Sequence, residues 1–129
     1  MPGLVTGLYA GLLGLLVLVL MVRVVRLRWK FRVGVGDGNE RTLLKAIRVH
    51  GNAVEHIPIA LVLLLVAELD KATPGFLHAA GGALVIARIF HAIGLSRTAG
   101  PSWPRAIGVV GTVGVIAVLA IYDIQAFFR

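Results

Sequence analysis

The sequence predicts an all-α integral membrane protein, a single domain forming a bundle of four transmembrane helices. Its composition is the first reason. The chain of 129 residues is 58% hydrophobic and 15% charged, with a mean hydropathy of +0.92, whereas a soluble domain is about half apolar and about a quarter charged. Its length is the second reason, because four spans of about 20 residues and their short connections would use all of it.

The distribution of basic residues predicts how these helices are oriented. Few basic side chains lie at one end of the expected bundle, where we find Lys71 and Arg129. The basic residues in or beside the two connections at the other end are Arg23, Arg26, Arg28, Lys30, Arg32, Arg41, Lys45, Arg97 and Arg105. This asymmetry follows the positive-inside rule, which places these connections in the cytoplasm and both termini outside. It accounts for the net charge of +7 without a nucleic-acid partner.

The first span is expected over residues 3–22, an uncharged segment that arginines follow at once. It lacks a preceding basic region and is too long for a signal-peptide core, so we interpret it as a retained helix. Its glycines form a small-residue stripe on one face: Gly3, Gly7, Gly11 and Gly14. Either the stripe lets another helix approach closely, or glycine is simply tolerated in a membrane helix, and the sequence supports both readings equally.

The second span is expected over residues 42–69. Its most apolar part, residues 57–67, is too short to cross a bilayer alone, so the crossing must include the polar segment 48–56. Pro58 lies inside this helix, which membrane helices tolerate when neighbouring groups satisfy the freed carbonyl.

The third and fourth spans are expected over residues 74–95 and 106–127. Thr73 is a suitable N-cap for the third span, with Pro74 at the first helical position. One edge of the fourth span is rich in glycine and is expected to pack closely, at Gly108, Gly111 and Gly114.

The most informative residues are the polar ones of the second span. Arg48, Asn52 and Glu55 are four and three residues apart, which puts them on one helical face. A guanidinium, an amide and a carboxylate are costly in lipid, so they need one another or a polar ligand. His56 flanks this face.

Two polar residues of the third span are expected at the same depth. Arg88 and His91 share a helical face, and the second and third spans are antiparallel. We therefore expect Arg88 to pair with Glu55, which would relieve the burial cost of both charges. The arginines expected around the cytoplasmic opening are Arg28, Arg32, Arg97 and Arg105. Two interpretations stay open: a network that only fixes helix packing, or a site for an anionic polar ligand from the cytoplasm.

No metal site is expected. The order of His50, Glu55 and His56 does not match the spacing of zinc proteases. The chain has no cysteine, so it offers neither a thiolate ligand nor a cysteine nucleophile. Any thiol chemistry would need a thiol supplied by a ligand.

The segment RVHGNAVEHIP, residues 48–58, closely resembles the signature of the membrane-associated proteins in eicosanoid and glutathione metabolism, the MAPEG family. The segments FRVGVGDGNERTLLKAI and ARIFHAIGLSR also resemble this family, especially its small bacterial members, and the likeness to microsomal glutathione S-transferase covers nearly the whole chain. The resemblance implies a homotrimer of four-helix protomers that binds glutathione between protomers, near the cytoplasmic side.

The resemblance also implies roles for individual residues. The expected glutathione-binding residues are Arg28, Arg48, Asn52, Glu55, His56, Arg88 and His91. Arg105 lies near the family's catalytic arginine at the start of the fourth span. Better-known members carry tyrosines where this chain has His56, His91 and Leu95, so the resemblance favours an arginine-dependent mechanism over a tyrosine-dependent one.

The expected function is therefore that of a glutathione-dependent transferase or peroxidase in a bacterial inner membrane, with lipophilic electrophiles or lipid hydroperoxides as substrates, glutathione as co-substrate and no metal. The alternative is a non-catalytic protein of the same family that binds lipids or partners. A small transporter is disfavoured, because residues 57–67 offer no polar path through the outer leaflet.

Overall fold

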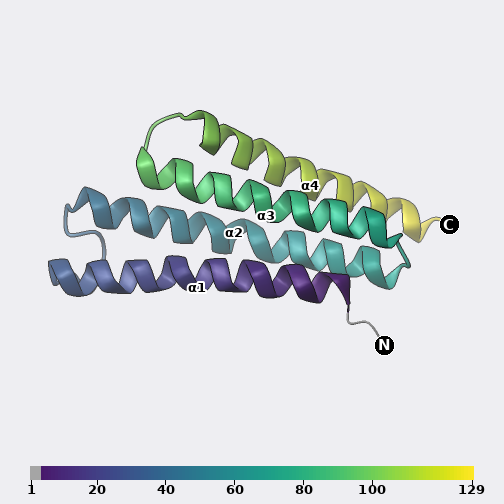
Figure 1. Ribbon diagram of the computed structural model, residues 1–129, viewed down its shortest axis with the longest axis horizontal. Coiled ribbons are helices and arrows are strands. Elements are labelled where there is room, and N and C mark those ends of the chain that lie inside the picture. The colour runs from purple at the N-terminus through teal and green to yellow at the C-terminus, as the bar shows by residue number, and fades with distance from the viewer. Residues whose placement is uncertain (1–3) are drawn as a thin grey trace.

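The computed structural model describes residues 4–129, which form four antiparallel helices and, over that range, no strand. The helices are α1 (Val5–Phe31), α2 (Arg41–Leu69), α3 (Pro74–Arg97) and α4 (Trp103–Phe127). Figure 1 shows them running back and forth along the long axis of the bundle, with the start of α1 and the end of α4 at the same end. All four are long and apolar enough to cross a membrane, so the predicted fold class, a four-helix transmembrane bundle, is confirmed.

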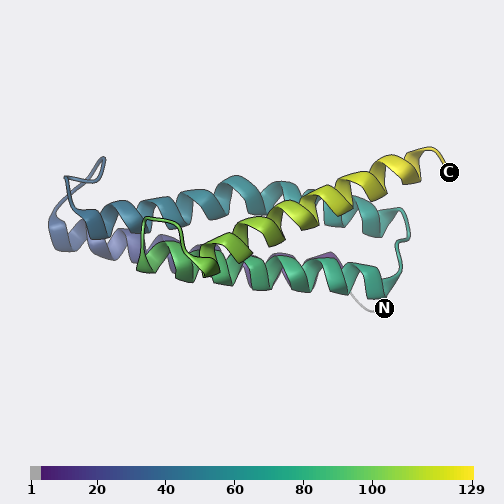
Figure 2. The ribbon, with the colours of Figure 1, turned by 90° about the horizontal axis from the view of Figure 1, so that it is seen from above.

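Helices α2 and α3 form the centre of the bundle. Helix α1 packs against both of them, and so does α4, whereas the described parts of α1 and α4 do not contact each other. Figure 2 shows α4 crossing the other helices obliquely. The two central helices are also the two that carry the polar segments of the sequence.

The core is built from apolar side chains supplied by every helix. Its fully buried leucines include one from each helix: Leu13, Leu64, Leu84 and Leu119. Each helix also presents large apolar side chains outward, for example Leu15, Val62, Ile86 and Val110. Because lipid is as apolar as leucine, close packing rather than removal from water holds such helices together. The apolar outer surface is suited to contact with membrane lipids.

Helix α1 continues to Phe31 instead of ending near Val22. The charges after Val22 signal the edge of the membrane, but arginine and lysine are good helix formers, so the helix extends beyond the apolar segment. It ends at Arg32, which adopts a left-handed conformation with φ 55° and closes the last turn onto the carbonyls of Arg28 and Trp29. The first part of the predicted connection is therefore helical.

The start of α1 is capped by a residue far away in the sequence. The backbone N–H groups of Val5 and Thr6 donate to the carboxylate of Glu68, at 2.6 and 2.8 Å. Glu68 lies in the last turn of α2. An anion at a helix N-terminus satisfies free N–H groups and complements the helix dipole. This contact fixes α1 against α2 at the end opposite the basic connections.

Glycines set the close approach of α3 and α4. A Cβ added at Gly108 would collide with the backbone of His91 and the carbonyl of Ala87, and one at Gly111 would come within 2.8 Å of the Ala87 Cβ. The predicted close edge of α4 stops there, because Gly114 has no neighbouring atom within 4 Å. Gly114 is turned by about 120° round the helix from Gly108, whereas Val115, at nearly the same angle as Gly108, is buried.

The glycine stripe of the first span does not pack within the protomer. A Cβ at any of three of its members, Gly7, Gly11 and Gly14, would meet no atom within 4 Å. The fourth member, Gly3, lies outside the described residues.

The predicted N-cap of the third helix is confirmed, since Thr73 Oγ1 accepts from the Phe76 N–H at 3.4 Å.

Candidate functional site

The candidate site lies on α2 and α3, in the half of the bundle nearest the two basic connections. Its outer part is an ion pair on α2, in which Arg48 Nη1 is 3.9 Å from Glu55 Oε1. Both side chains are 54% exposed in the isolated protomer. A guanidinium and a carboxylate therefore face outward from a helix that crosses the membrane.

Its inner part joins α2 to α3. Arg88 and His91 are almost completely buried, with 2% and 1% of their surface exposed. Arg88 Nη2 donates to Asn52 Oδ1 at 2.7 Å and lies 3.5 Å from His91 Nδ1. A charged donor bound to a neutral amide oxygen thus holds the two central helices together within the bundle.

The expected pairing of Arg88 with Glu55 is therefore wrong. Arg88 binds Asn52, and the partner of Glu55 is Arg48. The reason is the helical wheel, on which successive residues are about 100° apart. Asn52 is then rotated by about 40° from Arg48 and about 60° from Glu55, so the amide turns to α3 while the ion pair faces outward.

Two buried N–H groups of this site have no acceptor among the residues the structure describes, namely Arg88 Nε and His91 Nε2. A guanidinium can only donate, so His91 Nδ1 accepts from Arg88 and its proton is assigned to Nε2. Leaving a buried donor unpaired costs about 1–3 kcal/mol. The site therefore fits a ligand that is rich in oxygen acceptors.

His56 adds an acceptor at the edge of the site. Its Nδ1 lies 2.8 Å from the backbone carbonyl of Asn52. Because a carbonyl can only accept, Nδ1 carries the proton and Nε2 is left with a lone pair. The half-buried His56 thus stands beside the ion pair with an imidazole nitrogen able to accept a proton or a hydrogen bond.

The two predicted arginines outside α2 and α3 engage backbone carbonyls. Arg105, in the first turn of α4, donates through Nη1 to Ala99 O at 2.8 Å. Arg28 donates to Val33 O at 3.3 Å and Gly36 O at 2.8 Å, in the connection after α1. Within the protomer, the fold therefore gathers six of the eight predicted site residues, namely Arg48, Asn52, Glu55, His56, Arg88 and His91.

Arg105 nevertheless lies close to α3. Its backbone packs against Gly94, where an added Cβ would come within 3.0 Å of the Arg105 Cα and Cβ atoms. Gly94 is three residues beyond His91 on the same helix. The glycine thus lets the start of α4 approach the helix that carries Arg88 and His91.

The sequence interpretation missed one contact near the site. Arg23 Nη1 donates to Ser96 Oγ at 2.7 Å and joins α1 to α3. Both residues lie just outside the expected spans, residues 3–22 and 74–95, but both are helical. The spacing of Arg23, Arg26 and Lys30 at three and four residues is the signal that α1 continues with a charged face.

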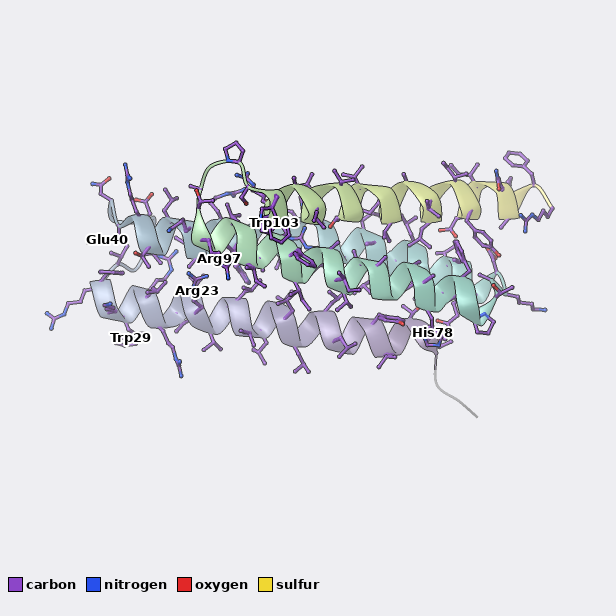
Figure 3. The ribbon with its side chains drawn as sticks, turned by 45° about the horizontal axis from the view of Figure 1, so that its top comes forward. Arg23, Trp29, Glu40, His78, Arg97 and Trp103 are labelled. Carbon is purple, nitrogen blue, oxygen red and sulfur yellow. The ribbon has the colours of Figure 1, made fainter. Side chains whose placement is uncertain are left out.

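The tyrosines lie far from this site. Tyr9 Oη is 2.9 Å from His78 Nδ1, and the ring of Tyr122 stacks on Phe76 at 5.0 Å. Both contacts involve the start of α3, and Figure 3 shows His78 at the opposite end of the bundle from Arg23 and Arg97. His78 is therefore a hydrogen-bonded histidine outside the candidate site.

Within residues 4–129 no group of three or more histidine, aspartate or glutamate side chains is arranged to hold a metal ion. The ion pair of Arg48 with Glu55 is the single salt bridge of the same segment. The chemistry that the site offers is hence that of arginine, amide, carboxylate and imidazole groups at the edge of an apolar bundle.

Comparison with known proteins identifies the family of this chain. The model of the MAPEG family matches residues 6–124, which include nearly all of the four helices. The chain is 47% identical over 90 residues to the inner membrane protein YecN of Escherichia coli strain K12 and to the protein of the same name in Escherichia coli O6:H1. Each match covers 70% of this chain and 69% of the relative. The chain belongs to the MAPEG family.

Proposed function

We propose that the protein is a membrane-embedded glutathione-dependent transferase or peroxidase that works as a homotrimer. Glutathione would bind between protomers, against α2 and α3. The second substrate would be a lipophilic electrophile or a lipid hydroperoxide that arrives from the bilayer. The family membership and the polar site in the membrane support this proposal.

The observation that carries the proposal is the outward position of the Arg48–Glu55 ion pair. Both side chains are 54% exposed on the protomer. Charged groups facing lipid are costly, and in membrane proteins they turn toward a protein interior or a water-filled cavity. A second protomer and a polar ligand would together remove these two charges from lipid.

The chemical groups of the site complement those of glutathione. Arginines bind carboxylates bidentately, so Arg48 and the free Nε–H of Arg88 fit the carboxylates at the ends of the tripeptide. Glu55 fits its ammonium group. The His91 Nε2–H, which has no acceptor within the described chain, fits an amide or carboxylate oxygen.

We assign to Arg105 the role of favouring the thiolate form of bound glutathione. A free thiol has a pKa of about 8.5, and a neighbouring arginine lowers it. With an electrophilic carbon, the thiolate sulfur would form a bond to that carbon and displace its leaving group. With a lipid hydroperoxide, it would attack the terminal oxygen and break the O–O bond; the alkoxide would take a proton from water and leave as the alcohol, and a second glutathione would convert the sulfenic acid to the disulfide and water. The cysteine-free chain is compatible, since the sulfur would come with glutathione.

We also propose a location and an orientation. The relatives that match are named inner membrane proteins, and a bacterial inner membrane suits this chain as well. The basic residues gather at the end that bears the α1–α2 and α3–α4 connections. By the positive-inside rule this end faces the cytoplasm, where glutathione would enter, and both termini lie outside.

Stopped-flow measurement of thiolate absorbance after mixing with glutathione tests this proposal. We expect a thiolate signal for the wild type and for Arg129→Ala, a control at the other end of the bundle. Arg105→Ala is expected to retain glutathione binding and to lose most of the signal, and Arg105→Lys to recover part of it. Absence of any signal in the wild type, with glutathione bound, would rule out this mechanism.

That outcome would favour a second candidate, a binding protein without turnover. The observation in its favour is the position of the tyrosines. Tyr9 and Tyr122 contact His78 and Phe76 near the start of α3, whereas the candidate site lies near its end. A mechanism that depends on tyrosine has no residue to use within this site.

A further inference from the structure

A cavity lies at the basic end of the bundle, between the start of α2 and the α3–α4 connection. It has a volume of about 540 Å³, within the range of about 300–1,000 Å³ that is usual for small-molecule sites. Its lining consists of Arg41, Leu44, Lys45, Arg97, Thr98, Ala99 and Gly100. None of these residues belongs to the site proposed for glutathione, and the link between the two is Arg105, which donates to the carbonyls of Ala99 and Gly100.

The lining of this cavity is cationic, and no acidic side chain in the lining balances its positive charge. Arg41 and Lys45 lie one turn apart on α2, and Arg97 is the last residue of α3. None of the three is within 4 Å of a carboxylate oxygen in the described chain, where the single ion pair is that of Arg48 with Glu55. Like charges around one cavity repel each other, and an anion bound between them would relieve that repulsion.

The cavity lies at the level expected for lipid headgroups. Trp103, 68% exposed, begins α4 directly after the connection that lines the cavity. Figure 3 shows Trp103 and Arg97 near the same end of the bundle. Exposed tryptophans mark the boundary between lipid and water, and Leu44, 41% exposed, gives the cavity an apolar wall.

The lining also limits the chemistry of the anion. Three cations line the cavity, and no carboxylate does. An ammonium group would thus find only positive charges, which disfavours zwitterionic lipids with an amino headgroup and also the amino end of glutathione. The same lining suits a phosphodiester whose headgroup carries no positive charge.

We propose that this cavity binds the phosphate of an anionic phospholipid without an amino group, such as phosphatidylglycerol. Arg41, Lys45 and Arg97 surround the phosphate, and Leu44 borders the glycerol and the start of the acyl chains. Basic pockets between helices at the cytoplasmic side of membrane proteins hold anionic headgroups in this manner. The proposal does not depend on glutathione or on catalysis.

Lipid-dependent thermal shift in detergent tests the proposal, with native mass spectrometry to count bound lipids. The purified protein is titrated with phosphatidylglycerol and, separately, with phosphatidylcholine. Phosphatidylglycerol is expected to raise the melting temperature and phosphatidylcholine to have no effect. Lys45→Gln and Arg97→Gln are each expected to weaken phosphatidylglycerol binding about fivefold, the effect of one basic residue at an anionic surface.

The matched control is Lys30→Gln, which removes the same charge at the same end of the bundle but outside the cavity. Equal weakening by Lys30→Gln would show unspecific attraction and overturn the proposal. Equally tight binding of soluble glycerol phosphate would assign the cavity to a soluble anion. Competition between glutathione and phosphatidylglycerol would make it part of the glutathione site. If Arg97→Gln does not fold, Arg97→Lys and Lys45→Gln test the proposal instead. Arg97→Lys keeps the charge and should keep phosphatidylglycerol binding, whereas Lys45→Gln should weaken it.

Discussion

Arg88 donates a hydrogen bond from Nη2 to Oδ1 of Asn52 at 2.7 Å, and this contact links α3 to α2 inside an apolar bundle. Only 2% of the surface of Arg88 is exposed, so the stability of its buried charge depends on the hydrogen-bond partners that the fold supplies. The same contact turns the amide of Asn52 inward and leaves Arg48 and Glu55 facing outward. The site thus consists of a buried contact that joins two helices and an ion pair at the surface of the protomer.

Replacing Asn52 with leucine should destabilise the protein by about 1.5–3 kcal/mol, the range for a hydrogen bond to a charged group. The leucine fills the space but leaves the Arg88 guanidinium without its acceptor. Thermal unfolding in detergent measures the loss. Gln125→Leu, an exposed amide on α4, is the control and should change stability little, while a stable Asn52→Leu would show that Arg88 does not need this partner.

Gly108→Ala should destabilise the protein by about 1–3 kcal/mol, the usual cost of overpacking. The new methyl group would meet the backbone of His91 and the carbonyl of Ala87, neither of which can turn aside. Gly114→Ala is the matched control on the same helix, because nothing lies within 4 Å of its Cβ position. Equal melting temperatures of the two variants would contradict the close approach of α3 and α4.

Glu68→Ala should loosen the start of α1, because the N–H groups of Val5 and Thr6 lose the carboxylate that accepts from both. We expect a cost of about 1–2 kcal/mol and faster hydrogen exchange in the first turn of α1. Asp70→Ala removes a charge two residues away and serves as the control. Unchanged exchange in Glu68→Ala would mean that this cap does not form in the membrane.

Tyr9→Phe should leave the rate of glutathione conjugation unchanged. The substitution removes a hydrogen bond to His78, worth about 1 kcal/mol of stability, at the end of the bundle away from the candidate site. Conjugation of glutathione to a lipophilic electrophile in detergent micelles is the assay. A large fall in rate with normal stability would bring a tyrosine back into the mechanism.

Much of the fold follows from the sequence, because apolar length, basic asymmetry and turn residues mark helices directly. Spacing along a helix predicts which residues share a face, and so it gave the groups Arg48, Asn52 and Glu55, and Arg88 and His91. Spacing does not predict how far a helix is rotated toward its neighbour. For that reason the partner of Arg88 was predicted as Glu55 and is Asn52.

Other features required contacts between distant segments. The charged residues after Val22 predict the edge of the membrane, and the end of the first helix was expected there. The helix itself continues to Phe31, because arginine and lysine favour helical structure. The capping of α1 by Glu68 joins residues 62 and 63 positions apart, beyond any local pattern. The close edge of α4 ends before Gly114 because glycines three residues apart drift by about 60° per step round the helix, so that the third one no longer faces a neighbour.

We propose that the outward ion pair of α2 binds glutathione. Isothermal titration calorimetry of glutathione in detergent tests it most directly, with the wild type, Arg48→Ala and Glu55→Ala. Arg26→Ala, an exposed arginine on α1 outside this face, is the control. We expect saturable binding by the wild type and the control and at least tenfold weaker binding by both site variants, since each loses a charged contact worth about 1.5–3 kcal/mol. Wild-type affinity in both Arg48→Ala and Glu55→Ala would show that this ion pair does not bind glutathione.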